Sequence, residues 1–188
     1  MGSQESKGGY RVLEVLEGSP AHEAALQLFT DFIVSVNGTV LQHSEMPFQE
    51  IIRRNSNCKI TLEVFNIISK ETREVKVTPK EWGGEGVLGV SLRFEELQEA
   101  LDQIMHVTYV QPGSPAELSG IMPQEDYILG SFDFFMKDVD ELLIFASCHE
   151  QVKLCLYSQK SKQARQVILK GGGNSLGIEV GTGALHTL

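Results

Sequence analysis

The chain has 188 residues and a formal net charge of −9 at pH 7, with 25 acidic residues against 16 lysines and arginines. This length allows one large domain or two small domains of about 90 to 100 residues each. The acid excess argues against a nucleic-acid-binding surface, which needs clustered cationic side chains. No apolar run reaches the ~18 to 20 residues that span a bilayer and the start lacks a signal-peptide core, so we expect neither a transmembrane nor a secreted protein.

The first six residues, MGSQES, match the pattern for N-myristoylation of Gly2, with Ser6 at the hydroxyl position of that pattern. One acyl chain holds a membrane only weakly, so stable attachment would need a second signal. We expect residues 1–9 to form a flexible segment that carries this lipidation site.

Cys58, Cys148 and Cys155 cannot all pair within one chain, and none lies in a C-x-x-C spacing. We therefore expect reduced thiols that serve as small buried apolar residues. The five histidines are not spaced as metal ligands either. The sequence predicts no metal site and no cofactor.

An internal repeat sets the predicted architecture. The tetrapeptide Gly-Ser-Pro-Ala at 18–21 recurs at 113–116, and Asp-Phe-Ile at 31–33 corresponds to Asp-Tyr-Ile at 126–128. The triplet Leu-Gly-Val at 88–90 likewise corresponds to Leu-Gly-Ile at 176–178. Matches that keep their order through small insertions and deletions indicate a duplication.

Each repeat predicts the same order of elements. Alternating residues predict a first strand, and the Ser-Pro pair that follows can cap and start a short helix. A second strand and an amphipathic helix come next, with Asn37-Gly38 as a turn signal in the first repeat. A hairpin follows and leads into the last loop and strand of the repeat. The predicted ranges are 11–16, 21–26, 32–36, 47–54, 59–66 and 72–78 in the first repeat, and 107–110, 116–119, 127–130, 139–146, 152–158 and 165–169 in the second.

Each repeat ends with a glycine-rich loop that runs into an alternating strand, WGGEGVLGVSLRF at 82–94 and GGGNSLGIEVG at 171–181. Glycine allows positive φ, and a loop of this kind can present several backbone N–H groups to a carboxylate. The adjoining strand edge can pair with an extended peptide. The sequence therefore predicts a groove for a carboxyl-terminal peptide tail in each repeat.

In each predicted groove the peptide adds a strand beside the glycine loop, and its last side chain rests on the apolar stripe of the amphipathic helix. The residues of groove 1 are Leu88, Gly89, Val90, Ser91, Leu92, Phe48, Ile51 and Ile52. The residues of groove 2 are Leu176, Gly177, Ile178, Glu179, Val180, Val139, Leu142, Leu143 and Ala146. We also expect Gly89→Val to abolish tail binding by crowding the carboxylate, while leaving the fold largely intact.

The order of elements resembles a PDZ domain in circularly permuted form, because the Φ-G-Φ strand comes last instead of near the beginning. The predicted fold class is mainly β with α+β character: two tandem PDZ-like, partly open β-barrels, each with two short helices. The predicted ranges are 10–94 for the first domain, 95–105 for an acidic linker helix and 106–188 for the second domain.

The segments DFIVSVNG at 31–38 and WGGEGVLGVSLRF at 82–94, with the myristoylation start, make the chain similar to the GRASP domain of the Golgi reassembly stacking proteins. This resemblance covers nearly the whole chain. It implies a peripheral protein on the cytoplasmic face of Golgi membranes that is acylated at Gly2 and self-associates in trans, across facing membranes, through its first repeat. It also implies binding of carboxyl-terminal tails of golgin-type coiled-coil proteins or cargo, and roles in cisternal linking and unconventional secretion.

The chain departs from that family in two places. Its second glycine loop begins Lys170-Gly171-Gly172, where the family has Trp-Gly-Gly, which predicts a looser or differently gated groove 2. The resemblance also implies a long Ser/Pro-rich regulatory tail after the domain, and we expect this chain to lack it.

The main alternative is a generic cytosolic tandem-PDZ adaptor without a membrane role. Two short patterns are also compatible with enzyme classes. The GEGVLG run at 84–89 spells the dinucleotide-binding fingerprint, but an alternating strand follows it instead of a helix. Permuted PDZ domains also accompany bacterial serine proteases, yet the chain has no G-x-S-x-G elbow. We therefore expect no enzymatic activity.

Overall fold

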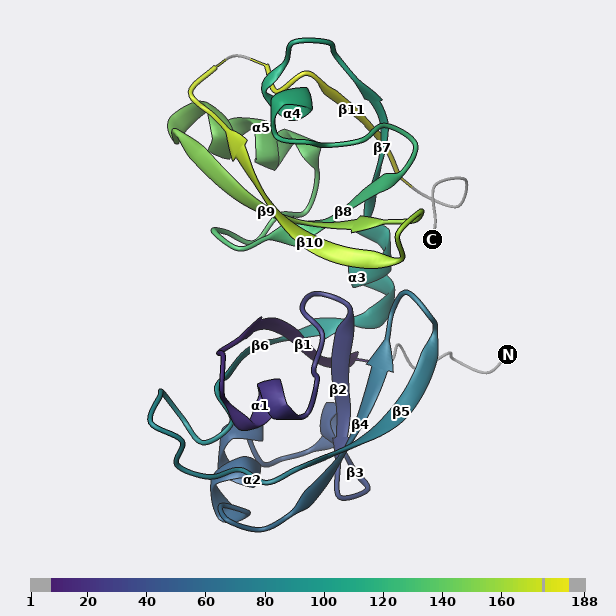
Figure 1. The fold of residues 1–188 in the computed structure, drawn as a ribbon. Helices are drawn as coiled ribbons and strands as arrows, with labels where there is room; N and C mark the ends of the chain where they lie inside the picture. The colour runs from purple at the N-terminus through teal and green to yellow at the C-terminus, as the bar shows by residue number, and fades with distance from the viewer. Residues whose placement is uncertain (1–7, 174, 183–188) are drawn as a thin grey trace, which may run out of the picture. The chain divides into compact units, whose positions relative to one another are not determined.

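The computed structural model describes residues 8–173 and 175–182, and the chain divides into two compact units, Met1–Glu99 and Ala100–Leu188. Each unit is built on an antiparallel sheet with short helices beside it (Figure 1). The predicted fold class, mainly β with partly open sheets and two short helices per repeat, is confirmed.

The sheet of unit 1 has the strand order β5-β4-β2-β1-β6, with β3 paired to β2 off this path. Its strands are β1 (Gly8–Val15), β2 (Asp31–Val36), β3 (Thr39–Val40), β4 (Ile60–Asn66), β5 (Glu71–Val77) and β6 (Val90–Glu96). Its helices are α1 (Pro20–Glu23), the single 3-10 turn η1 (Leu41–His43) and α2 (Phe48–Arg54).

The sheet of unit 2 repeats this order as β10-β9-β8-β7-β11. Helix α3 (Leu97–Asp102) precedes it. The strands are β7 (Met105–Val110), β8 (Asp126–Ser131), β9 (Gln151–Ser158), β10 (Gln163–Lys170) and β11 (Ile178–Gly181), and the helices are α4 (Pro115–Leu118) and α5 (Val139–Cys148). The common strand order supports the duplication inferred from the repeat.

The two Ser-Pro pairs start helices as expected. Ser19 and Ser114 are the N-caps of α1 and α4 with the same backbone angles, φ −78° and ψ 163°. The Ser19 hydroxyl accepts the His22 N–H at 3.1 Å, and the Ser114 hydroxyl accepts the Glu117 N–H at 3.3 Å. Each cap satisfies one of the amides that a helix start leaves without a partner.

The Asn37-Gly38 turn joins β2 to the short strand β3, which the sequence did not predict. Both residues have positive φ, 49° and 78°, as a two-residue hairpin turn with the twist of its flanking strands requires. Ser35 and Val36 pair across it with Val40 and Thr39.

Two predicted boundaries near the ends of unit 1 are wrong. Strand β1 begins at Gly8, which pairs with Glu96, so residues 8 and 9 belong to the sheet and not to a flexible segment. Strand β6 also continues to Glu96, which shortens the expected linker helix to α3. The linker helix was expected to begin at Glu95, but this residue lies in β6 and is only 9% exposed, as the ion-pair partner of the buried Arg11 at 3.2 Å.

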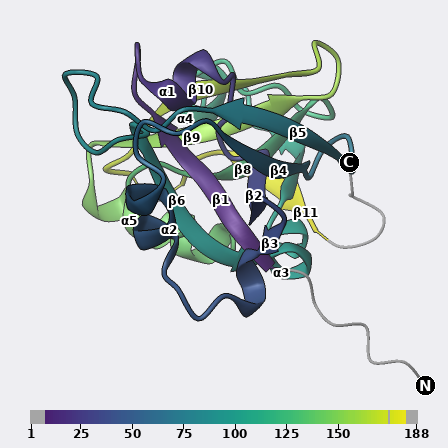
Figure 2. The ribbon, with the colours of Figure 1, turned by 90° about the horizontal axis from the view of Figure 1, so that it is seen from below.

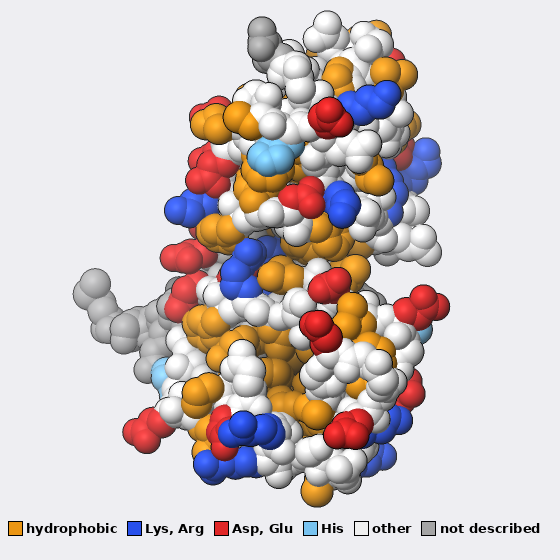
Figure 3. Space-filling model, turned by 90° about the vertical axis from the view of Figure 1, so that its left-hand side faces the viewer, with side chains coloured by type: hydrophobic (Ala, Val, Ile, Leu, Met, Phe, Trp, Pro, Cys, Tyr) orange, Lys and Arg blue, Asp and Glu red, His pale blue; other side chains and the backbone are white. Residues whose placement is uncertain are grey.

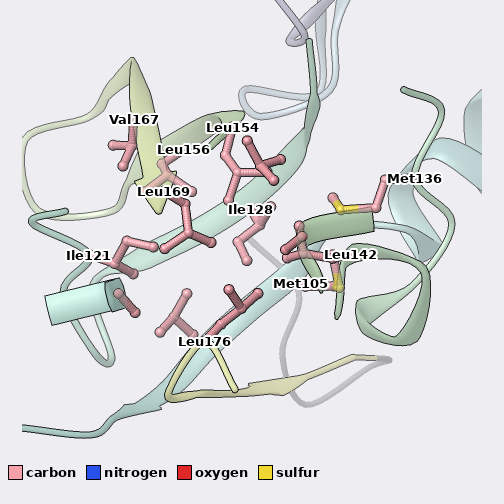
Figure 4. Packing of buried hydrophobic residues seen from close by; sticks show 14 of the residues in the cluster. Met105, Ile121, Ile128, Met136, Leu142, Leu154, Leu156, Val167, Leu169 and Leu176 are labelled. Carbon is pink, nitrogen blue, oxygen red and sulfur yellow. The ribbon is translucent and has the colours of Figure 1, made fainter. Parts of the chain in front are cut away.

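The core of each unit is apolar and lies between the sheet and its helices. In unit 2, Ile128, Leu142, Leu154 and Leu156 are fully buried, and their side chains point toward one another in the interior (Figure 4). Each such side chain contributes roughly 1.5 to 3 kcal/mol through burial. The amphipathic helix α5 is thereby anchored to its sheet through Leu142.

A buried aspartate is held by an arginine at the same place in each unit. Arg73 of β5 donates two hydrogen bonds to Asp31, at 2.9 and 2.5 Å, and Arg165 of β10 donates two to Asp126, at 2.8 and 2.6 Å. Both aspartates have 0% exposure. Hydrogen bonding to its aspartate raises the pKa of each arginine above its ordinary value. These pairs tie the edge strands β5 and β10 to the starts of β2 and β8.

Candidate peptide-binding grooves

Both predicted peptide-binding strands lie at a sheet edge. Strand β6 pairs with β1 and strand β11 with β7, and each ends its sheet in the described part of the chain. Figure 2 shows β6 running along β1. A strand at an edge keeps one row of N–H and C=O groups available for a further strand. The geometry needed for β-augmentation by an extended peptide is therefore present in both units.

The loop before β6 turns its amide groups away from helix α1. The carbonyl of Leu88 accepts the Ala21 N–H at 3.0 Å, and the carbonyl of Gly89 accepts the Leu16 N–H at 2.9 Å. The C=O and N–H of one trans peptide unit point in opposite directions. The N–H groups of Gly89 and Val90 consequently point to the opposite side, where an incoming carboxylate could accept from them.

The apolar surface of groove 1 comes from both β6 and α2. Val90, Leu92 and Ile51 are half-buried and pack against the core of unit 1. Figure 3 shows hydrophobic side chains gathered along a hollow in unit 1. Ser91 is exposed and its hydroxyl donates to Glu14 at 3.0 Å. These four predicted residues lie where a bound peptide could reach them.

Three predicted groove 1 residues belong to the core instead of the surface. Phe48, Ile52 and Leu88 are only 4%, 3% and 4% exposed. An aromatic ring that was not predicted covers Phe48: Tyr10 of β1 lies 5.0 Å from it, centroid to centroid, and 5.4 Å from Phe94 of β6. The signal for this cluster was the register of β1 against β6, which places Tyr10 opposite Phe94.

Gly89 fits its site for a reason other than the expected one. Its φ is +65°, and a Cβ at this position would lie 2.3 Å from the Cβ of Ser19 and 2.6 Å from the Trp82 ring. The expectation that Gly89→Val leaves the fold largely intact is therefore wrong, because valine would collide with the capping serine of α1. Gly89 is therefore needed for the conformation of the loop, and a substitution there would affect a bound carboxylate only through the change in that conformation.

The glycine loop of unit 1 is closed by the single tryptophan of the chain. The indole N–H of Trp82 donates to the carbonyl of Gly86 at 3.0 Å. The same ring lies over Gly84 and Gly89, where added Cβ atoms would lie within 2.2 and 2.6 Å of it. Trp82 thus holds the loop in shape beside groove 1.

The glycine loop of unit 2 is fixed in another way. Gly171 donates to the carbonyl of Glu150 at 2.9 Å and Gly172 donates to the carbonyl of Ala146 at 2.7 Å. A Cβ on Gly171 would lie 2.1 Å from the carbonyl oxygen of His149. The two glycines therefore bond to the last turn of α5 and to the residues after it. The glycine loop of unit 2 is thus attached to the helix of groove 2, whereas the glycine loop of unit 1 packs on Trp82.

The amide of groove 2 that corresponds to Gly89 already has a partner. The carbonyls of Leu176 and Gly177 accept from Ala116 and Gln111, at 3.2 and 2.8 Å, as their counterparts do in unit 1. The N–H of Gly177, however, donates to the hydroxyl of Ser175 at 3.2 Å. A carboxylate entering groove 2 has to displace this hydroxyl, which groove 1 does not require.

The predicted side chains of groove 2 also divide between core and surface. Leu142, Ala146 and Leu176 are buried in the core, and Val139, Ile178 and Val180 are half-buried against it. Leu143 and Glu179 are exposed.

An unpredicted ring stack lies on α5. Phe145 contacts Phe134 and His149, with centroids 4.1 and 3.8 Å apart, and Ile144 is 68% exposed. Phe134 comes from the loop before the helix, so the periodicity of the helix alone could not reveal the stack.

Other classes of site find no support in the residues described. No group of three or more His, Cys, Asp or Glu side chains within 8–173 and 175–182 could hold a metal ion. The helices in that part of the chain are all too short or too polar to span a bilayer. The expectation of three buried thiols is correct for Cys155 and wrong for Cys58 and Cys148, which are exposed.

Each unit thus presents an edge strand, opened by a Φ-G-Φ loop and flanked by a helix, in the permuted order of a PDZ-like domain. The family model of the GRASP55/65 PDZ-like domain matches residues 3–92 and again residues 62–188. The chain belongs to this family.

Three relatives span nearly the whole chain. It is 36% identical to Golgi reassembly-stacking protein 1 of Homo sapiens and 35% identical to that of Mus musculus, over 96% of this chain and 42% of each relative. It is also 32% identical to an uncharacterized protein of Schizosaccharomyces pombe, over 96% of this chain and 53% of that protein. The chain therefore spans about half the length of these relatives or less.

Proposed function

We propose that this protein is a non-enzymatic scaffold of Golgi membranes that binds the carboxyl-terminal tails of coiled-coil golgins or cargo. The observation that carries this proposal is the pair of amides at Gly89 and Val90, turned away from α1 at the start of a free edge strand. The names of the human and mouse relatives support the Golgi role.

In this proposal the terminal carboxylate of a tail accepts from the amides of Gly89 and Val90, and the tail adds a strand along β6. Its last side chain packs against Ile51 and Leu92, which are half-buried and so available for further burial. Hydrogen bonds from amides to an ionised acceptor are about twice as strong as neutral ones. The carboxylate therefore supplies much of the specificity for a chain end.

Membrane attachment in this proposal uses two signals. One is acylation of Gly2, which lies outside the described residues. The other is the bound membrane protein tail, because a single acyl chain gives only reversible attachment. Copies on facing membranes then self-associate in trans, and many weak contacts act together through avidity to link cisternae. A role in unconventional secretion follows from binding cargo tails at the same grooves.

The experiment that tests the groove is a titration with synthetic ten-residue tails that end in valine, leucine or isoleucine. Binding is followed by the fluorescence of Trp82, which lies beside groove 1 and is the single tryptophan. We expect saturable binding by tails with a free carboxylate and at least tenfold weaker binding by the same tails as carboxamides, since tenfold corresponds to about 1.4 kcal/mol. Equal binding of both forms would overturn the proposal.

A matched pair of variants locates the binding site. Ile51→Asp places a charge on the α2 wall of groove 1, whereas Val40→Asp places one at an exposed valine of β3 outside it. We expect loss of tail binding in Ile51→Asp alone, with unchanged circular dichroism in both. Retained binding in Ile51→Asp would place the tail elsewhere.

Two measurements distinguish the proposed function from the alternative, a cytosolic adaptor without a membrane role. Mass analysis of the protein from its native cells shows whether Gly2 carries a myristoyl group. Aggregation of vesicles that bear the acylated protein then shows bridging. A protein that binds tails but is never acylated and bridges no vesicles would be the adaptor.

A further inference from the structure

We propose that groove 1 selects its tails by an aromatic side chain at the fifth residue from the carboxyl end, which packs on the rings of Tyr10 and Phe94. This inference rests on the proposed function and names the class of tail that groove 1 takes. Two observations carry it: the register of β1 with β6, and the exposed ring of Phe94 beside Tyr10. We call Tyr10 and Phe94 together the aromatic site.

The direction of a bound tail fixes which of its residues reaches the aromatic site. In the proposed function the carboxylate lies at the start of β6, at the amides of Gly89 and Val90, so the tail runs toward that start and pairs antiparallel with β6. The last residue of the tail then lies opposite Val90. Alternate residues of a strand share a face, and so do residues directly opposite one another in a pair. The third residue from the end therefore lies opposite Leu92, and the fifth lies opposite Phe94.

Strand β6 alternates regularly over this stretch. The register shift between β1 and β6 lies between Val12 and Glu14 of β1. Their partners on β6, Leu92 and Ser91, are consecutive, so the extra residue belongs to β1 and β6 has none. A tail paired with β6 from residue 90 to residue 94 can therefore stay in register along the whole length.

The aromatic site continues the apolar face of groove 1. Leu92 packs against the core of unit 1 from β6, and Phe94 is the next residue on the same face. The ring of Phe94 contacts Tyr10, and Tyr10 contacts Phe48 of α2, so the rings connect β6 to the helix that flanks the groove. A side chain opposite Phe94 thus meets an apolar surface that begins at the site of the last residue.

The ring of Phe94 is held in place and still open to a ligand. It lies over Gly8, where an added Cβ would come within 2.5 Å of it, and it meets Tyr10 edge-to-face at 76°. Its residue is nevertheless 42% exposed, and Tyr10 is half-buried. Apolar surface that is already ordered gains from further burial without a large cost in side-chain entropy.

The geometry of the rings favours an aromatic side chain as the occupant. Aromatic rings prefer edge-to-face or offset contacts, and Tyr10 and Phe94 already form one, which a third ring can extend. A lysine or arginine could instead place its charge over a ring, but the gain at an exposed ring is small. An aromatic side chain also buries its own apolar surface, so it gains more.

Groove 2 lacks this site. The two sheets have the same register, including the shift, so Thr182 corresponds to Phe94 and Met105 corresponds to Tyr10. Thr182 is exposed and Met105 is only 1% exposed. We therefore expect selection at the fifth residue in groove 1 alone.

The test is the Trp82 titration of the 188-residue chain with ten-residue tails that differ only at the fifth residue from the end. That residue is phenylalanine, alanine or lysine, and each tail is made as free acid and as carboxamide, without tryptophan. We expect the phenylalanine free acid to bind roughly tenfold more tightly than the alanine free acid, and more tightly than the lysine one. Phenylalanine moved to the fourth or sixth residue should lose the gain, because these residues point to the other face.

A matched pair of variants locates the contact. Phe94→Thr places the residue of groove 2 in groove 1, whereas Tyr109→Thr removes an exposed aromatic residue from β7 of unit 2. We expect the affinity ratio of the phenylalanine and alanine tails to fall to near one in Phe94→Thr and to stay unchanged in Tyr109→Thr. Because the ratio compares two tails on one protein, a general loss of stability does not imitate this result. The shift of phenylalanine along the tail tests the wild type without any variant.

The same titrations separate this inference from the proposed function. Equal binding of the phenylalanine and alanine tails, an equal gain at the fourth or sixth residue, a lysine tail that binds as tightly, or an unchanged ratio in Phe94→Thr would each overturn the inference. A preference for free acids over carboxamides would still support the proposed function in those cases. Equal binding of acids and carboxamides would overturn the proposed function and, with it, the register on which the aromatic site depends.

Discussion

The side chain of Ser19 joins the start of helix α1 to Gly89 of the loop that opens groove 1. Its hydroxyl accepts the His22 N–H at 3.1 Å and donates to the carbonyl of Gly89 at 3.3 Å. Ser114 caps α4 in the same way and lies against Gly177, whose added Cβ would come within 2.2 Å of the Ser114 Cβ. In both units, the helix cap and the Φ-G-Φ loop therefore form one packed contact.

Substitution of either loop glycine should destabilise its unit. Gly89→Ala forces a side chain into positive φ and against Ser19, which should cost about 2 to 4 kcal/mol from strain and overpacking together. Gly177→Ala should do the same in unit 2. Thermal unfolding followed by circular dichroism measures both. The control is Gly38→Ala, where φ is also positive but no atom lies within 4 Å of the new Cβ, so the cost should be only about 1 kcal/mol. Equal losses at all three sites would contradict the contact described.

Removing the buried aspartates should also destabilise the units. Asp31→Ala deletes both bonds from Arg73, the bond from the backbone N–H of Gln27 and the bond from the side-chain amide of Asn66. Breaking a buried pair costs about 3 to 5 kcal/mol, and partial exposure of Arg73, at 38%, reduces this to about 2 to 4 kcal/mol. Denaturant titration of Asp31→Ala and of the matched Asp126→Ala measures the loss.

The stability that Arg73 contributes through its pair with Asp31, and Arg165 through its pair with Asp126, should not change with pH near neutrality. The pKa of Arg73 is raised by its hydrogen bonds to Asp31. A raised folded-state pKa gives stability that is fully present below the unfolded value and is lost only as pH rises through the folded value. For arginine that window lies far above neutral pH. Denaturant titration of the wild type and of Asp31→Ala at pH 7 and pH 9 checks this. A difference in unfolding free energy between the two proteins that falls sharply from pH 7 to pH 9 would contradict it.

Glu95→Ala should affect unit 1 most severely. Arg11 is 1% exposed and its guanidinium lies over the rings of Phe29 and Phe32, at 5.2 and 5.5 Å, with Glu95 as its carboxylate. Removing this carboxylate from the buried cation should cost about 3 to 5 kcal/mol. The rate of amide hydrogen exchange in β1 and β6 should rise, because the loss of stability makes these strands open more often. The exposed Glu99→Ala serves as the control and should have little effect.

Ser175→Ala should strengthen binding of carboxylates at groove 2. The substitution removes the hydroxyl that accepts the Gly177 N–H at 3.2 Å, so a carboxylate no longer competes with it. Because this bond is exposed, the gain should be about 0.5 to 1 kcal/mol, or a few-fold in affinity. Chemical-shift titration of the Gly177 amide with free-acid tails measures it, in an Ile51→Asp background that silences groove 1. An unchanged affinity would show that the hydroxyl does not guard the groove.

Sequence patterns predicted those features that depend on neighbours along the chain. The Ser19 and Ser114 caps, the Asn37-Gly38 turn and the edge position of β6 and β11 all follow from local residue types and the repeat. Features that depend on partners far apart in sequence were missed. The acidic residue Glu95 belongs to β6 because of Arg11, 84 residues away.

The candidate grooves show the same division. The loop glycines were identified, but periodicity could not tell which face of α2 is buried, so Phe48 and Ile52 were assigned to the surface although they lie in the core. Tyr10 was missed because its contacts with Phe48 and Phe94 depend on the pairing of β1 with β6. The contact of Gly171 and Gly172 with the end of α5 was missed because it joins two segments that are distant in sequence.

Strand β6 closes unit 1 by pairing with β1, so that Glu96 meets Gly8 and the first and last strands of the unit lie together. A ribosome therefore has to release β6 before β1 gains this neighbour. Until then the nascent unit lacks the edge that is proposed to bind a tail, and β1 is itself an edge strand. In the proposed function, a newly made chain therefore gains this edge for a partner's tail only after the first repeat has been translated.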